Sequence, residues 1–418
     1  MKTERNFPKT VITKKGTRWV EDGHPWVYEG EVLSVLLPDG RPANDGEVPD
    51  GALSDVVTEG GKYLGTGFFN AKSKIRVRIL SKNANDRFDE AFFFRRIQYA
   101  LDYRRTVMGA DFSACRLIFG EADGFPGLTV DRFSNLLVAE VLSKGIDDRK
   151  DFIFREIVRQ LRAGGEIIDG LYERDESSIR TLEGLPKYKG WYRFGDEPVP
   201  ESAVTRITEN GITYSVDVEN GQKTGFFLDQ KYNRLAVMRL AKGKKVLDCF
   251  THTGSFALNA AKGEALHVTA VDVSAAAIDM AKQNAVLNGL ENRMDFLVAD
   301  VFDLLPALEK QGGHSYDFII LDPPAFTKSR KTAENAEKGY KEINYRAMKL
   351  LPRGGYLATA SCSHFMPNER FEKMLRSAAK DAGVELKQIE VRQQAADHPV
   401  LWNVPETEYL KFYLFQVV

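Results

Sequence analysis

The chain has 418 residues, with 43% hydrophobic and 28% charged side chains, which is typical of a globular protein of two or three domains. Its 58 Lys and Arg against 59 Asp and Glu give a formal net charge of −1, which excludes a generally basic nucleic-acid-binding protein, so any RNA contact must come from local patches. No secretory signal and no apolar run of about 18 residues occurs, so we expect a cytoplasmic protein with no membrane segment.

Residues 1–80 have the pattern of a small β-barrel, with short alternating runs separated by Gly and Pro turns. In the last run, Lys74, Arg76 and Arg78 alternate with apolar residues, so a strand would carry these three cations on one face. This basic stripe would either bind RNA or form a solvated outer face, and the sequence leaves both readings open.

Residues 81–200 read as a compact α/β region without a catalytic signature of its own. Apolar residues at near-helical spacing predict a helix over 88–108, in which arginines such as Arg95 and Arg104 face either RNA or water. Strands over 115–119 and 136–142 and a helix over 150–161 are expected to follow.

Residues 201–418 carry the signs of a cofactor site. A buried strand over 245–250 runs into a tight loop containing Gly254 and then into a helix, an arrangement typical of nucleotide-cofactor sites at the carboxyl end of a parallel strand. Three later strands end in Asp272, Asp300 and Asp322, although each acid alone could be a helix cap or a turn residue. The loop lacks the glycine pattern of NAD folds and the Lys of a P-loop, so S-adenosylmethionine is the expected cofactor.

The chain has three cysteines, too few and too scattered for a disulfide framework, and no zinc-like spacing, so we expect no metal site. Cys362 follows an apolar run downstream of Leu321-Asp322-Pro323-Pro324. Carbon 5 of a pyrimidine needs a thiolate added at carbon 6 before it can accept a methyl group, and cysteine suits that chemistry. The alternative is a small buried residue at the end of a strand.

Four segments of the chain resemble the family of ribosomal RNA large subunit methyltransferase I. They are Asp248-Cys249-Phe250-Thr251-His252-Thr253-Gly254, Leu321-Asp322-Pro323-Pro324-Ala325-Phe326, Ser361-Cys362-Ser363 and Gly221–Gln230. Gly23-His24-Pro25-Trp26-Val27 and Phe125–Asp131 extend the resemblance over nearly the whole chain. The resemblance implies a PUA domain over 1–80, a central α/β linking domain over 81–200 and a class I, Rossmann-like S-adenosylmethionine-dependent methyltransferase domain over 201–418. It also implies 5-methylcytosine formation in large-subunit (23S) ribosomal RNA, and a possible homodimer.

The same resemblance, together with the strand-tip pattern, assigns roles to residues. Cys362 would attack carbon 6, and Asp322 would hold the amino edge of a flipped cytosine. The stretch 222–230 would form a lid over cofactor and base. The expected cofactor-binding residues are Gln222, Thr224, Asp248, Phe250, Thr251, Thr253, Gly254, Asp272, Val273, Asp300, Val301 and Asp322. The expected substrate-binding residues are Lys74, Arg76, Arg78, Pro323, Pro324 and Phe326.

Two other functions fit parts of this pattern. Methylation of a purine nitrogen would use the Asp322-Pro323-Pro324 loop and would need no nucleophilic cysteine. A non-catalytic RNA-binding factor for ribosome assembly would keep only the cofactor fold. Cys362 favours methylation at carbon, and Gly254 and Asp272 favour an enzyme.

Overall fold

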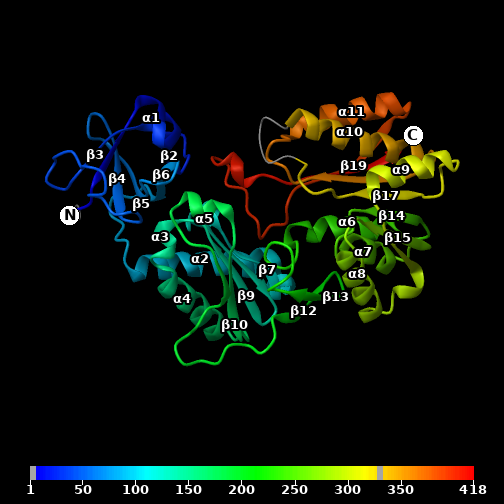
Figure 1. The fold of residues 1–418 in the computed structure, drawn as a ribbon, viewed down its shortest axis with the longest axis horizontal. Coiled ribbons are helices and arrows are strands. Elements are labelled where there is room, and N and C mark those ends of the chain that lie inside the picture. The colour runs from blue at the N-terminus through cyan, green and yellow to red at the C-terminus, as the bar shows by residue number, and fades with distance from the viewer. Residues whose placement is uncertain (1–5, 327–332) are drawn as a thin grey trace. The chain divides into compact units, whose positions relative to one another are not determined.

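The computed structural model describes residues 6–326 and 333–418, which divide into two compact units (Figure 1). The first comprises Met1–Ile207, Val216–Leu228 and Ala396–Thr407, and the second comprises Thr208–Ser215, Asp229–Ala395 and Glu408–Val418. The predicted boundary at residue 200 lies close to the first change of unit. Two later segments nevertheless belong to the first unit, because they pack there and not on the sheet that their neighbours in sequence build.

The N-terminal part of the first unit is a six-stranded sheet whose hydrogen-bonded order is β2-β6-β5-β4-β1-β3. Its core includes Ile12, Val27, Val56 and Val77, the inward residues of alternating runs. Lys14 and Arg18 lie in helix α1, whose N-cap Thr13 accepts a hydrogen bond from the amide of Gly16. The elements are β1 (Lys9–Ile12), α1 (Lys14–Glu21), β2 (Trp26–Tyr28), β3 (Val32–Leu36), β4 (Leu53–Thr58), β5 (Tyr63–Phe69) and β6 (Ile75–Ser81).

The expected basic stripe on β6 is not an open surface. The side chain of Arg78 is 9% exposed and forms ion pairs with Glu183 at 2.9 Å and Glu121 at 3.4 Å. Arg76 pairs with Glu29 at 2.7 Å. Only Lys74 of the three cations is exposed. The alternating pattern correctly placed Arg76 and Arg78 on one strand. It could not predict the carboxylates, distant in sequence, that neutralise them.

The central part of the first unit is a five-stranded sheet of order β11-β10-β9-β8-β7, with helices α2 and α4 packed together beside it (Figure 1). Asp89 caps the N-terminus of α2 by accepting a hydrogen bond from the amide of Phe92. The elements are α2 (Glu90–Met108), β7 (Ala114–Phe119), β8 (Leu128–Phe133), β9 (Leu136–Val141), α3 (Lys144–Asp147), α4 (Lys150–Ala163), β10 (Gly170–Asp175), α5 (Ser178–Leu182) and β11 (Tyr188–Trp191). The hairpin β12 (Val204–Glu209) and β13 (Ile212–Asp217) follows.

The second unit is built on a seven-stranded sheet of order β16-β15-β14-β17-β18-β20-β19. β14 to β18 pair in parallel, and β20 runs antiparallel to both of its neighbours. Figure 1 shows α6, α7 and α8 on one face and α9, α10 and α11 on the other. The strands are β14 (Lys245–Cys249), β15 (His267–Asp272), β16 (Met294–Val298), β17 (Phe318–Leu321), β18 (Tyr356–Ser361), β19 (Leu386–Arg392) and β20 (Lys411–Val417). The helices are α6 (Lys231–Leu240), α7 (Ser255–Lys262), α8 (Ala275–Leu287), α9 (Val301–Lys310), α10 (Ala333–Leu350) and α11 (Asn368–Ala382).

This order confirms the predicted open α/β sheet. Because the strands from β14 to β18 are parallel, their carboxyl ends meet at one edge, and the strand order reverses direction beside β14. Asp272, Asp322 and Cys362 each follow the last residue of a strand or form it, so all three lie at that edge.

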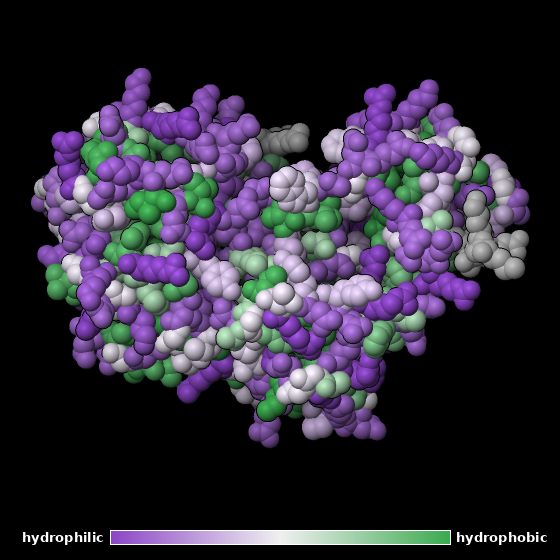
Figure 2. All heavy atoms as spheres, turned by 180° about the vertical axis from the view of Figure 1, so that it is seen from behind, coloured by the Kyte–Doolittle hydropathy of each residue, from purple (hydrophilic) through white to green (hydrophobic). Residues whose placement is uncertain are grey.

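On the face drawn in Figure 2, hydrophilic side chains cover most of the surface and hydrophobic ones occur in small groups among them. Within residues 6–326 and 333–418, no helix has the length and hydropathy needed to cross a bilayer.

A buried ion pair fixes α6 to the hairpin strand β12. Arg234 and Glu209 are 1% and 0% exposed, and their two hydrogen bonds measure 2.5 and 2.8 Å. Replacing Glu209 by Ala leaves a buried guanidinium without its carboxylate and should lower the free energy of unfolding by about 3 to 5 kcal/mol. Denaturant titration measures this. The matched control is Glu264→Ala, which breaks the exposed Lys242–Glu264 pair and should leave the unfolding midpoint unchanged; equal losses in both variants would contradict the prediction.

Candidate cofactor and base site

The loop between β14 and α7 has a strained backbone. Phe250 and His252 adopt left-handed conformations, with φ of 64° and 52°, which non-glycine residues rarely adopt. Gly254 caps α7 with φ of 79°, and a Cβ atom there would lie 2.9 Å from the Cβ of Ala281. The position therefore requires glycine for both conformation and space. The result is a tight turn that opens the N-terminus of α7 toward the carboxyl edge of the sheet.

Asp248 and Thr253 hold buried oxygen atoms suited to a ligand. Asp248 is fully buried, and its Oδ2 accepts hydrogen bonds from the Thr251 hydroxyl at 2.5 Å and the Ala257 amide at 2.9 Å. Its Oδ1 and the hydroxyl of Thr253 have no hydrogen-bond partner within the described part of the chain. Burial raises the pKa of Asp248 to about 7, and the nearby charge of Asp322 adds to this rise. A ligand ammonium would satisfy these oxygens and favour the carboxylate, so the loop fits the methionine end of S-adenosylmethionine.

Asp272 is the last residue of β15, and its carboxylate contacts the same loop. Its Oδ2 accepts a hydrogen bond from the amide of His252, and its Oδ1 accepts one from Ser274, both at 2.9 Å. Because each carboxylate oxygen can accept more than one hydrogen bond, Asp272 can still bind the ribose hydroxyls of the cofactor. The neighbouring Val273 side chain is 71% exposed, which leaves an apolar surface beside the carboxylate for a ligand to cover.

At the end of β16, the structure gives Asp300 a capping role. Its side chain accepts a hydrogen bond from the amide of Phe302 at 2.8 Å and so caps α9. Asp300 therefore has the helix-capping role that the sequence left open for each of these acids. Val301 is buried in the core, so only its main chain can reach a ligand. Phe302, which the sequence did not single out, is 38% exposed at the same place.

Removing the Asp272 carboxylate should weaken cofactor binding. Asp272→Ala leaves ribose hydroxyls unpaired, and we expect a loss of about 1 to 3 kcal/mol in the binding free energy of S-adenosylmethionine, measured by calorimetry. Asp295→Ala is the control, since Asp295 is an exposed acid on the same sheet. Unchanged affinity for S-adenosylmethionine in a folded Asp272→Ala protein would contradict the assignment of Asp272 to the ribose hydroxyls.

Asp322 follows β17 and is oriented by two amides. Its Oδ1 accepts a hydrogen bond from Nε2 of Gln230 at 2.9 Å, and the amide oxygen of Gln230 accepts one from Asn233 at 2.6 Å. Pro323 is buried and Pro324 is exposed. Gln230 is the last residue of the stretch predicted as a lid, and its side chain holds the carboxylate of Asp322; the lid role of the stretch stays a prediction.

Cys362 directly follows β18 and is partly exposed. Its neighbour Ser361 pairs across the sheet with Lys411, the first residue of β20. The ammonium of Lys411 donates hydrogen bonds to the carbonyls of Ser363 and Tyr409, both at 2.7 Å. Lys411 thus contacts the chain on both sides of Cys362.

Lys411 is a cation in an unusual setting. It is 6% exposed, and no carboxylate of the described residues lies within ion-pair distance of it. Burial lowers the pKa of Lys411 to about 8, and the charge of Cys362 opposes this change. The sequence analysis did not identify this residue, although a lysine opening an otherwise apolar strand was a usable signal.

Aromatic residues lie beside these groups. Burial raises the pKa of Tyr340 on α10 to about 12, and the charges of Cys362 and Asp322 add to this rise. The ring of Phe326 lies 4.7 Å from that of Tyr340, 5.7 Å from Phe302 and 6.3 Å from Phe250. Phe326 is therefore part of an aromatic cluster, and its predicted stacking on the base stays a prediction.

Cys249 on β14 is fully buried, and burial raises the pKa of its thiol well above the usual value, so it is not a source of thiolate. Gln222 and Thr224 belong to the first unit, where the Thr224 hydroxyl donates to Asp131 at 2.6 Å. Their place over the cofactor stays a prediction.

Comparison with known proteins gives consistent matches. The family model for S-adenosylmethionine-dependent methyltransferases matches residues 194–415, and that for PUA-like domains matches residues 11–82. Ribosomal RNA large subunit methyltransferase I of Klebsiella pneumoniae (strain 342) is 38% identical over the full length of both chains. The enzyme of the same name from Serratia proteamaculans (strain 568) is 39% identical, covering 94% of this chain and 96% of its own.

Two solved structures share the fold. One is a protein of Streptococcus mutans described as an S-adenosylmethionine-dependent methyltransferase, with a TM-score of 0.78 and 21% identity over 98% of this chain and 99% of its own. The other is a methyltransferase in complex with SAH, with a TM-score of 0.80 and 21% identity over the same shares. Ribosomal RNA large subunit methyltransferase I proteins are thus 38% and 39% identical over nearly the whole chain, and both family models match it. The chain belongs to the ribosomal RNA large subunit methyltransferase I family and is an S-adenosylmethionine-dependent methyltransferase with a PUA-like domain.

Proposed function

We propose that this enzyme methylates carbon 5 of a cytosine in large-subunit ribosomal RNA through a covalent bond to Cys362. The observation that carries the proposal is a partly exposed thiol at the carboxyl edge of the sheet, bracketed by the contacts of a buried, cationic Lys411. The full-length relatives support ribosomal RNA as the substrate.

In the first step the thiolate of Cys362 adds to carbon 6 of the base, which makes carbon 5 nucleophilic. S-adenosylmethionine supplies the methyl group when it is bound. Loss of the proton at carbon 5 then expels the thiolate and restores the double bond. A base inside a helix must leave its stack for this chemistry, so the target lies in a flipped or single-stranded nucleotide.

Asp322 would recognise the base. Held by Gln230, its carboxylate can accept a hydrogen bond from the exocyclic amine of cytosine, which uracil lacks. Pro323 and Pro324 fix the backbone that follows it. Discrimination against uracil would arise because uracil would place a carbonyl oxygen, which cannot donate a hydrogen bond, against the carboxylate of Asp322.

Lys411 would act on the nucleophile as a positioning residue. Its ammonium is charged below about pH 8, and a nearby cation increases the fraction of a cysteine present as thiolate. Methylation of a purine nitrogen would need neither this cation nor the thiol, so a buried cation bound to the residues next to Cys362 favours a pyrimidine carbon.

Nucleoside analysis tests the reaction product. Ribosomal RNA lacking the modification is incubated with the enzyme and methyl-labelled S-adenosylmethionine, digested and separated. We expect the label in 5-methylcytidine. Label in an N-methylated purine would replace the proposal with the purine-nitrogen reaction.

A further inference from the structure

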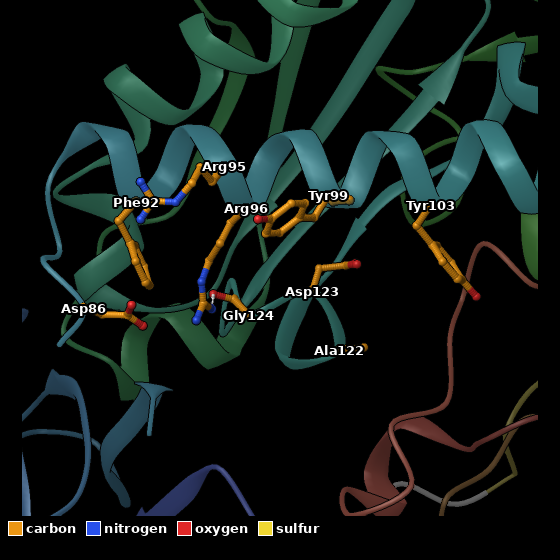
Figure 3. Close-up of a pocket in the computed structure, with 10 residues that line it drawn as sticks. Asp86, Phe92, Arg95, Arg96, Tyr99, Tyr103, Ala122, Asp123 and Gly124 are labelled. Carbon is orange, nitrogen blue, oxygen red and sulfur yellow. Dashed lines mark hydrogen bonds between the residues drawn. The ribbon is translucent and has the colours of Figure 1, made fainter. Parts of the chain in front are cut away.

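A hollow of about 520 Å³ lies on the first unit, between α2 and the turn around Gly124 (Figure 3). Arg95, Tyr99 and Tyr103 reach it from one face of α2, because residues four apart in a helix lie above one another. Asp123 and Gly124 border it from the facing turn. The volume lies in the range of small-ligand sites.

Arg96 places a positive charge in the wall of this hollow. Its guanidinium lies over the ring of Phe92 at 4.3 Å and donates to the carbonyls of Leu80 at 2.6 Å and Gly124 at 2.9 Å. Burial lowers the pKa of Arg96 to about 10, so it stays charged at neutral pH. Gly124 has a φ of +72°, and a Cβ there would lie 1.8 Å from Nη1 of Arg96. The turn is therefore shaped around the guanidinium.

Neither arginine of the hollow forms an ion pair with the two acids that line it, although the charge of Asp86 acts on Arg96. Asp123 forms an ion pair with the buried Arg104, whose Nη2 lies 2.7 Å from its Oδ2. Asp86 accepts hydrogen bonds from two polar neighbours in its own turn. Within the part of the chain that the structure describes, neither Arg95 nor Arg96 lies within 4 Å of a carboxylate. The hollow thus retains positive charge, which suits a phosphate.

Beside this charge stand exposed aromatic rings. Tyr99 is 67% exposed and Tyr103 is 38% exposed, and the hydroxyl of Tyr103 is fixed by donating to the carbonyl of Ala396. Single-stranded RNA is bound by such combinations, in which unstacked bases lie on aromatic rings and phosphates contact arginine.

We propose that the hollow binds a single-stranded segment of the RNA substrate, with a base on Tyr99 and a phosphate at Arg95 and Arg96. The inference rests on RNA as the substrate in the proposed function, and is independent of which base is methylated. It gives the enzyme a contact to RNA outside its PUA-like domain.

Fluorescence anisotropy with a labelled single-stranded oligoribonucleotide of about 12 nucleotides tests the proposal on the full-length protein. Tyr99→Ala and Arg95→Glu should each weaken binding at least about fivefold, and Arg95→Glu should also flatten the salt dependence. Arg353→Glu is the matched control: Arg353 is exposed, lies in the second unit just before β18, and changes the charge equally. It should bind within about twofold of wild type.

Wild-type affinity in Tyr99→Ala, or an equal loss in Arg353→Glu, would overturn the hollow as an RNA site. If the wild-type protein does not bind the oligoribonucleotide at all, the result would contradict both the hollow as an RNA site and the proposal that the enzyme acts on RNA. Both variants should bind S-adenosylmethionine as wild type does, and a loss there would show general damage and overturn the interpretation of their weaker RNA binding.

Discussion

Replacing Cys362 by Ser should lower methylation of ribosomal RNA by about three orders of magnitude or more, because a hydroxyl is not ionised near neutral pH and cannot add to carbon 6. Affinity for S-adenosylmethionine should not change, since the cofactor loop lies after β14 and the thiol after β18. Single-turnover assays with labelled cofactor, with calorimetry on the same protein, measure both.

Cys249→Ser is the control for this experiment. Cys249 is fully buried on β14 and its thiol has a raised pKa, so it supplies no nucleophile, and the variant should keep most of its activity once folded. A Cys362→Ser enzyme that methylates at near wild-type rate would reject covalent catalysis and favour methylation of a purine nitrogen at Asp322.

Lys411→Met should reduce the rate about ten- to a hundredfold at pH 7, because the thiolate loses its neighbouring cation. The pH profile separates this role from a structural one. Burial lowers the pKa of Lys411 to about 8, so its charge is present below that pH and is lost as the pH rises through it. Wild-type activity should therefore fall above about pH 8, to the extent that it depends on this charge.

Lys411→Arg sharpens the test, since arginine stays protonated throughout this range. The arginine variant should keep its activity above pH 8 better than wild type does. If the methionine and arginine variants share the wild-type profile and differ only in stability, Lys411 merely holds the carbonyls of Ser363 and Tyr409.

The residues that we assign to the cofactor could be named from the sequence because the features that mark them are local. The conformation of Gly254 and the acid at the end of β15 are encoded within a few residues of sequence, and parallel strands bring such tips to one edge. The parallel pairing of β14 to β18 agrees with the open α/β sheet that the alternation of strands and helices predicted.

The features that local patterns could not predict depend on partners distant in sequence. Lys411 contacts the residues on either side of Cys362 only because β20 returns antiparallel to β18, and Gln230 binds Asp322, which is 92 positions away in sequence. Arg78 was expected on an open basic face, yet Glu183 and Glu121 neutralise it. Ala396–Thr407 likewise belongs to the first unit because of partners distant in sequence: Asp397 accepts a hydrogen bond from the amide of Arg116.

Covalent trapping tests the central claim most directly. In RNA whose cytosines are replaced by 5-fluorocytosine, fluorine cannot leave carbon 5 as a proton does, so the enzyme should remain bonded to carbon 6 after methyl transfer. We predict a denaturant-resistant complex that requires S-adenosylmethionine and whose nucleotide-bearing peptide contains Cys362. Full turnover without such a complex, or an adduct on another residue, would contradict Cys362 as the nucleophile.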